Sequence, residues 1–368
     1  MAMEENNRRA FAIQAHYCRE MAAPIYARLC DALSRCLTRA SKTGACILDW
    51  PGEPTRDALP LRLMGGLHAL VLAGADAGLA RIFSGEITKN AAIDAELQRA
   101  LSEHDTALLP WLDGPPQTNE PGRSAALMTG LLEVARTCEP RIEIIEIGSS
   151  GGLNLLIDRY RFNLGGAAVG PVDAPITISP EWRGEPFVDA APIDIVSTRG
   201  CDVRPLDVTD PAVEARLLAY VWPETPARAA RLRVAIDMLR AHGVSLDKAD
   251  AADWVEAQLR LPQAPGTTRV LMHSVVWQYL PEPVAERIRA AMANAGAKAD
   301  AARPLAWVAM EPDRALAEQV VSIRCWPGDD ARRIIATCHA HATWIRPGAS
   351  VQTGSGGPLV EGAVKIVL

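Results

Sequence analysis

The feature that most constrains this chain is an alternation of short apolar segments with helical segments, which begins at residue 142. Ile142–Ile147 (IEIIEI) has the pattern of a buried strand, and further strands are predicted at about 193–203, 244–246, 270–276, 305–310 and 320–326. Helical patterns lie between them, at 153–160, 227–242, 253–261 and 284–295. Such alternation is typical of an α/β fold, a doubly wound and mostly parallel sheet with helices on both faces.

The first third of the chain has a different pattern. Apolar residues recur at steps of three and four from Phe11 to Cys36, and similar stretches cover about 60–82 and 93–109. Pro24 should kink or split the first of these helices. The segment Pro110–Gly122 is dense in Pro and Gly and marks a boundary. We therefore predict a helical N-terminal domain over residues 1–118 and the sheet domain over 119–368.

Composition excludes several classes of protein. The 368 residues are 49% hydrophobic and 22% charged, with a net charge of -6, which argues against disorder and against nucleic acid or an anionic membrane as the main partner. No two of the eight cysteines form a CxxC pair, so we expect reduced thiols in a cytoplasmic protein. The N-terminus lacks the apolar core of a signal peptide, and Asp76 and Arg81 interrupt the apolar window Gly65–Ile82, which predicts a core helix. His339 and His341 lack an evident third metal ligand, and we expect no metal.

The segment with the clearest chemistry is Glu146–Asn154 (EIGSSGGLN), which links the first strand to a predicted helix. Glycines in such a turn allow positive φ and a close approach of a ligand to the backbone. The N-terminus of the following helix presents free N–H groups and a partial positive charge. The turn could hold a carboxylate, a phosphate or a ribose edge, or it could serve packing alone.

The turn resembles the first motif of class I S-adenosylmethionine-dependent methyltransferases, an acidic residue followed by three spaced glycines, with a serine in place of the middle glycine. The resemblance implies cofactor contacts from Glu146, Gly148, Ser149, Ser150, Gly152 and Asn154. An alternative is the G-x-S-x-G nucleophile elbow of a serine hydrolase, with Ser150 as nucleophile and His339 or His341 downstream. That fold needs several strands before the elbow and an HGGG-type loop, and the sequence predicts neither.

Two later acidic positions extend the methyltransferase resemblance. Asp202 matches the residue that ends the second strand and binds the ribose hydroxyls, although it lies 54 residues after Gly148, where about 20 is usual. An inserted hairpin or loop over about 161–192 would explain the excess; otherwise Asp173 or Glu181 becomes the candidate. Asp250, with Ala251 beside it, matches the loop that meets the adenine. Asp250 is equally suited to cap the following helix.

The ends of the fourth and fifth predicted strands supply candidates for catalysis. The methyltransferase resemblance implies that His273 borders the transferable methyl group. It also implies that Glu311 lies at the strand end where substrates usually bind. Either could act as a base, if the acceptor carries a proton to lose. A histidine at a strand end is also common as a purely structural residue.

The chain from near its N-terminus to about Trp344 also resembles an uncharacterised bacterial family catalogued as a domain of unknown function. The matching signatures are Gln117–Arg123, Gly148–Tyr160, Glu181–Gly184 and Val221–Glu224. That family looks like a methyltransferase-type Rossmann domain behind a helical part. The resemblance places the first signature near the cofactor, where Asn119, Glu120 and Arg123 could close over the methionine moiety. The alternative is a simple turn with a surface arginine.

These observations lead us to expect a class I methyltransferase-type Rossmann-like domain that uses S-adenosylmethionine to methylate a small molecule. The helical domain would be a lid, a substrate-selecting cap or a surface for homodimer formation. Two alternatives stay open: a catalytically silent cofactor-binding module for regulation or interaction, and the serine hydrolase.

Overall fold

The computed structural model describes residues 2–186, 192–313, 316, 318–328 and 330–352, which form two compact units. The helical unit runs through Thr118 and includes Asp210–Ala230, whereas the sheet unit contains Asn119–Thr209 and the described residues from Arg231 to Gln352. The domains expected from the sequence were 1–118 and 119–368, which placed residues 210–230 in the second domain. This segment belongs to the helical unit because Glu224 accepts hydrogen bonds from the amides of Ile25 (2.7 Å) and Tyr26 (3.1 Å).

The helical unit is built from short helices around one apolar core. Its elements are α1 (Ala2–Glu20), α2 (Pro24–Cys36), α3 (Lys42–Leu48), α4 (Leu59–Leu72), α5 (Ala77–Phe83), α6 (Asn90–Glu103), α7 (Asp105–Leu108), η1 (Leu109–Asp113) and α9 (Pro211–Ala219). Pro24 splits the first predicted segment, since α2 begins at this residue. The predicted 60–82 helix is two helices, because Asp76 caps α5 by accepting a hydrogen bond from the Leu79 amide.

Among the described residues, no single helix is long and apolar enough to cross a membrane. Helices α4 and α5 reach that length and composition only as a pair, and they are bent by 111° at the break between them.

The sheet unit contains a nine-stranded mixed sheet in the order β5-β12-β11-β10-β9-β8-β1-β6-β7. The strands are β1 (Arg141–Ile147), β5 (Glu181–Trp182), β6 (Asp194–Asp202), β7 (Ser245–Lys248), β8 (Thr268–Ser274), β9 (Leu305–Asp313), β10 (Glu318–Trp326), β11 (Arg333–Cys338) and β12 (Trp344–Gln352). The five strands from β7 to β9 are all parallel to their neighbours. The mostly parallel α/β sheet predicted from the sequence is therefore confirmed.

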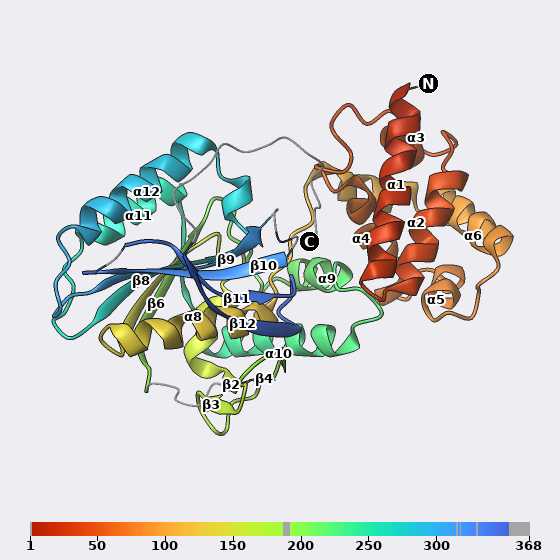
Figure 1. Ribbon diagram of the computed structural model, residues 1–368. Helices are drawn as coiled ribbons and strands as arrows, with labels where there is room; N and C mark the ends of the chain where they lie inside the picture. Colours follow the sequence, from red (N-terminus) through yellow and green to blue (C-terminus); the bar gives the residue numbers. More distant parts are fainter. Residues whose placement is uncertain (1, 187–191, 314–315, 317, 329, 353–368) are drawn as a thin grey trace. The chain divides into compact units, whose positions relative to one another are not determined.

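Helices cover both faces of the parallel part (Figure 1). On one face, α11 (Ala251–Arg260) and α12 (Glu282–Gly296) share an apolar cluster with Leu271 and Trp307. On the other face lies α8 (Ser124–Thr137), where Gly130 is needed because a Cβ there would sit 2.5 Å from the Val308 side chain. The adjacent β9 residues Trp307 and Val308 thus face opposite helical layers. The remaining helical elements are η2 (Pro121–Arg123), η3 (Leu153–Arg159), η4 (Trp277–Tyr279) and α10 (Pro226–His242).

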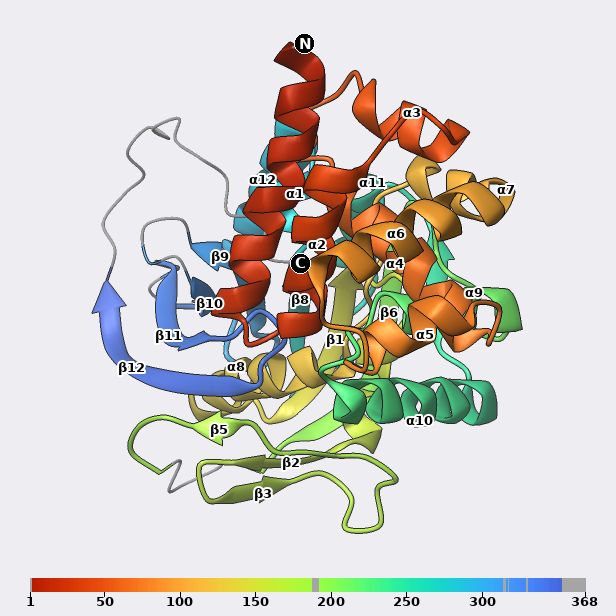
Figure 2. The ribbon, with the colours of Figure 1, turned by 90° about the vertical axis from the view of Figure 1, so that its right-hand side faces the viewer.

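The antiparallel edge was not predicted. Strands β10, β11 and β12 pair in antiparallel fashion beyond β9, and β12 follows a long curve beside β11 (Figure 2). Because these strands pair in antiparallel fashion with β9 and with one another, this part of the sheet differs from the doubly wound parallel sheet that the sequence predicts. The helix predicted at Leu153–Tyr160 is present as a 3-10 helix over Leu153–Arg159.

The expected insertion is present. After η3, β2 (Arg161–Leu164) and β3 (Ala167–Val169) form an antiparallel hairpin, and β4 (Thr177–Ile178) pairs in parallel with β2. This small separate sheet, together with β5, accounts for the long spacing between the Gly turn and Asp202. Residues 187–191 of the predicted insertion and 353–368 of the predicted second domain lie outside the described residues.

Candidate functional site

The candidate site lies at the carboxyl ends of β1, β6 and β8. The chain leaves β1 for β6 and β7 on one side and later returns to β8 and β9 on the other. Strand order therefore reverses between β1 and β8, and open α/β sheets bind ligands at such a switch point. The Gly148–Gly152 turn follows β1 at this position.

Three residues of the turn have left-handed backbone conformations. The φ angles are 67° at Gly148, 55° at Ser150 and 81° at Gly152, so serine occupies a conformation that favours glycine. Gly148 is also needed for packing, because a Cβ there would lie 2.3 Å from the Val276 side chain. The turn after β1 and the loop after β8 are therefore in direct contact.

Asp202 binds the turn directly. One carboxylate oxygen accepts the amide N–H of Ser150 at 2.9 Å, and the other accepts that of Arg204 at 2.8 Å. The sequence placed Asp202 at the end of a strand, and in the structure this strand is β6, beside β1, so the carboxylate reaches the turn. Its carboxylate keeps further lone pairs for a ligand hydroxyl. The ribose role stays a prediction.

Glu146 and Asn154 lie beneath the turn. The Glu146 side chain is 1% exposed, and its Oε1 accepts a hydrogen bond from Asn154 Nδ2 at 3.0 Å. Asn154 Oδ1 in turn accepts the Ser124 hydroxyl at 2.9 Å. Burial raises the pKa of the Glu146 carboxyl to about 7, and the nearby Asp202 adds to this rise. This chain of contacts supports the turn from the interior of the sheet unit.

The segment before α8 closes around the same turn. Asn119 Nδ2 donates to the Ser149 carbonyl at 2.9 Å, as its expected position near the turn requires. Glu120 accepts the amide of Gly122 at 2.9 Å and pairs with Arg231 at 2.9 Å. Arg123 is buried and donates through Nε to the Ala340 carbonyl at 3.0 Å. Arg123 is therefore not the surface charge that the alternative interpretation proposed.

Asp250 caps α11. Its Oδ1 accepts the amides of Ala252 at 2.9 Å and Asp253 at 3.1 Å, which confirms the capping interpretation. Asp250 and Ala251 follow β7, the second strand away from β1. Their role toward adenine stays a prediction, because a cap formed through one oxygen leaves the other oxygen available.

His273 and Glu311 form a buried pair. His273 Nδ1 lies 2.7 Å from Glu311 Oε1, and the Trp307 indole donates to His273 Nε2 at 2.9 Å. Because an indole N–H can only donate, Nε2 is the accepting nitrogen and Nδ1 carries the proton that Glu311 accepts. Glu311 Oε1 also accepts the amides of Val276 (3.0 Å) and Trp277 (3.2 Å). Both ring nitrogens of His273 are thus engaged by the protein itself.

This pair borders a cavity of about 300 Å³ between the ends of β8, β9 and β10 and α12. Sequence reasoning missed its other polar and aromatic walls, which are Trp277, Arg289, Trp307, Arg324 and Arg332. A signal was present in the sequence, since Arg324 interrupts the apolar run of β10, where a charged side chain needs a reason.

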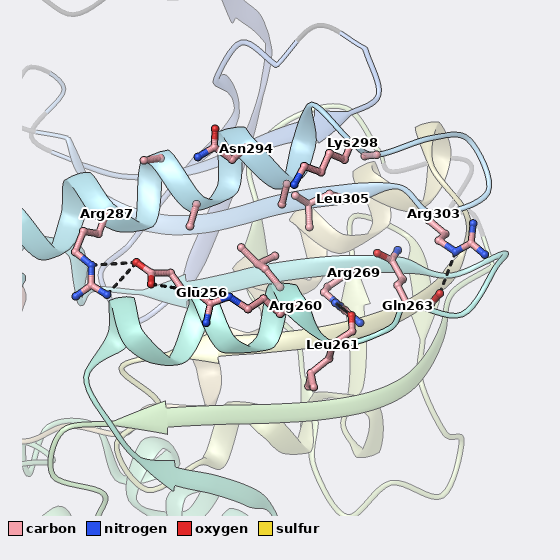
Figure 3. A pocket seen from close by; sticks show the side chains of 15 residues that line it. Glu256, Arg260, Leu261, Gln263, Arg269, Arg287, Asn294, Lys298, Arg303 and Leu305 are labelled. Carbon is pink, nitrogen blue, oxygen red and sulfur yellow. Dashed lines mark hydrogen bonds and ion pairs between the residues drawn. The ribbon is translucent and has the colours of Figure 1, made fainter.

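Another cavity, of about 520 Å³, lies at the amino ends of β8 and β9, between α11 and α12 (Figure 3). Two of its arginines are paired within the protein: Arg269 with Glu143 at 3.0 Å, and Arg287 with Asp253 and Glu256 at 2.7 and 2.9 Å. Ligands of open α/β sheets bind at the opposite edge. We therefore do not assign the functional site to this cavity.

The serine hydrolase alternative is supported by the backbone conformation of Ser150, but Ser150 lacks a histidine base in the part of the chain that the structure describes. Ser150 has the positive φ of a strained strand-to-helix turn. Within the described ranges, however, its Oγ has no hydrogen-bond partner, so neither His339 nor His341 is paired with it as a base. No group of three or more His, Cys, Asp or Glu in the same ranges could hold a metal ion.

The fold and this geometry define an α/β protein with a cluster of polar groups at the switch point of a mixed sheet. The chain belongs to the bacterial family described as "Uncharacterized protein conserved in bacteria" (DUF2332), whose model matches residues 8–346. No curated protein and no solved structure matches the chain.

Proposed function

We propose that this protein binds S-adenosylmethionine and transfers its methyl group to a small molecule. The observation that carries the proposal is the contact between Asp202 and the Ser150 amide at 2.9 Å. It joins a Gly-rich turn after β1 to an acidic residue after β6, at the switch point of the sheet. This arrangement resembles the sites at which class I methyltransferases hold the cofactor.

The residues present fit such a cofactor. The Ser150 hydroxyl is buried at the turn with no partner in the part of the chain that the structure describes, so it is free to bind a ligand. The Asp202 oxygens each accept one backbone N–H and can accept ribose hydroxyls as well. The turn backbone, Asp202 and Asp250 would hold the cofactor, with Asn119 positioning the turn. When bound, the cofactor supplies a methyl group already activated on a sulfonium sulfur.

The chain's own contribution is positioning and, for an acceptor with a proton to lose, a base. His273 is unsuited to be that base, because both of its nitrogens are engaged by Glu311 and Trp307. Glu311 Oε2 is buried and has no hydrogen-bond partner among the described residues, so it is the available proton acceptor of the pair. We therefore assign His273 to positioning and Glu311 to proton transfer.

The test is isothermal titration of the full chain with S-adenosylmethionine and S-adenosylhomocysteine, together with thermal shift. At 100-fold excess over the dissociation constant, a ligand of the folded state adds about 2.7 kcal/mol of stability. Asp202→Asn, which keeps the size of the side chain, should weaken binding at least 10-fold. Asp207→Ala is the matched control, because Asp207 lies in the same loop and, within the described ranges, its side chain bonds only Thr209.

The outcomes separate the candidate functions. Absence of binding at millimolar ligand would refute the proposal. Binding without transfer to any acceptor would favour the silent module. Labelling of Ser150 by a fluorophosphonate probe would instead favour the hydrolase.

A further inference from the structure

The cavity of about 300 Å³ that His273 and Glu311 border lies on the α12 face of the sheet, and it includes the carboxylate that the proposed function assigns to proton transfer. Its volume lies at the lower end of the range for small-molecule sites, about 300 to 1,000 Å³. We propose that it binds a small aromatic carboxylate, held by Arg324 and Arg332 with its ring against the indoles of Trp277 and Trp307. The inference does not depend on the cofactor.

The cavity is rich in positive charge. Three guanidinium groups line it, from Arg289, Arg324 and Arg332. Among the residues that the structure describes, neither Arg324 nor Arg332 makes an ion pair, and Arg332 donates only to the Ser322 hydroxyl, at 3.1 Å. Burial lowers the pKa of Arg324, and Arg332 and Arg289 lower it further, whereas Asp330 opposes the shift. An anion would relieve this repulsion.

Among the described residues of the cavity wall, Glu311 is the one carboxylate, and it does not neutralise these cations. Glu311 Oε1 accepts three N–H groups, those of the His273 ring, Val276 and Trp277. Arg289 pairs with Glu282, and both side chains of that pair are exposed, at 39% and 69%. Arg324 and Arg332 are therefore the groups left to bind a ligand carboxylate, for which a planar guanidinium is well suited.

The walls favour a flat ring. The Trp307 indole is fixed by its hydrogen bond to His273, and Trp277 stacks on the same imidazole with ring centroids 5.2 Å apart. Cations already lie beside both indoles: the Arg324 guanidinium carbon is 5.6 Å from the Trp307 ring centre, and that of Arg289 is 5.7 Å from Trp277. Rigid indoles next to cations suit a ligand that combines a ring with a negative charge.

The experiment is isothermal titration of the full chain, without cofactor, using four probes. Benzoate carries both features, benzamide has the ring without the charge, and cyclohexanecarboxylate has the charge without the flat ring. Inorganic phosphate tests for a simple anion site. We expect benzoate to bind at least 10-fold more tightly than each of the other three. Equal affinity for phosphate, or for benzamide, would overturn the proposal, as would failure of benzoate to bind.

Variants locate the binding. Arg324→Gln should weaken benzoate at least 10-fold, and Arg332→Gln is the second variant if the first fails to fold. Arg287→Gln is the matched control, because Arg287 lies on α12 but pairs with Asp253 and Glu256 of α11. Equal affinity in the Arg324 and Arg287 variants would overturn the assignment. Since no cofactor is present, failure here is distinguishable from failure of S-adenosylmethionine to bind.

Discussion

The ionisation of Glu146 gives the sharpest test of the buried contacts under the Gly turn. Its side chain is 1% exposed, one oxygen accepts from Asn154, and the other has no hydrogen-bond partner in the described part of the chain. Burial raises its pKa from 4.5 to about 7. Glu146→Gln keeps an oxygen for Asn154 and removes the group that can ionise.

The pKa difference determines how stability depends on pH. The unfolded chain releases the Glu146 proton near pH 4.5, whereas the folded chain keeps it to about pH 7. Between these values the folded state binds more protons, so the free energy of unfolding falls as the pH rises. Because a tenfold difference in proton affinity is worth about 1.4 kcal/mol, a rise of the pKa from 4.5 to about 7 removes about 3.5 kcal/mol once both states are ionised, near pH 8. The glutamine variant does not pay this ionisation cost.

Urea unfolding followed by tryptophan fluorescence at pH 5, 6, 7 and 8 measures the effect. From pH 5 to 8, the free energy of unfolding of Glu146→Gln should rise by roughly 2 to 3 kcal/mol relative to the wild type. Glu286→Gln, which changes an exposed carboxylate of α12, should show no such trend. A difference between Glu146→Gln and the wild type that stays constant with pH would refute the reasoning. A variant that becomes relatively less stable as the pH rises would refute it equally.

Three further predictions concern stability measured by thermal or urea unfolding. Glu311→Ala leaves three N–H donors without their acceptor and should cost about 3 kcal/mol or more, while Glu311→Gln keeps an acceptor and should cost clearly less; equal losses would contradict this. Glu224→Ala removes the acceptor for two amides at the start of α2 and should cost about 0.5 to 2 kcal/mol, so an unchanged midpoint would be evidence against that role. Gly151→Ala would place a Cβ 2.5 Å from Val208 and should cost about 1 to 3 kcal/mol, whereas Gly114→Ala, with open space around it, should be nearly neutral.

Two hydrogen-bonded pairs show how candidate residues that the sequence named separately come together in the fold. The contact between Asp202 and the Ser150 amide follows from strand adjacency, since a Gly turn and an acidic residue at the ends of neighbouring parallel strands meet at one edge. The pairing of His273 with Glu311 was not predicted, although both were named as candidates. It depends on the register between β8 and β9, which no local pattern encodes.

The sequence by itself determined the strands β1, β8, β9 and β10 and the helices between the parallel strands. Each of these depends on hydrophobic periodicity or on Pro and Gly in adjacent residues, which act over a few positions. Only the tertiary structure decided the antiparallel edge, the place of residues 210–230 and the cavity with its arginines and indoles. These features bring together side chains far apart in the chain, and their pairing is selected by packing over the whole core.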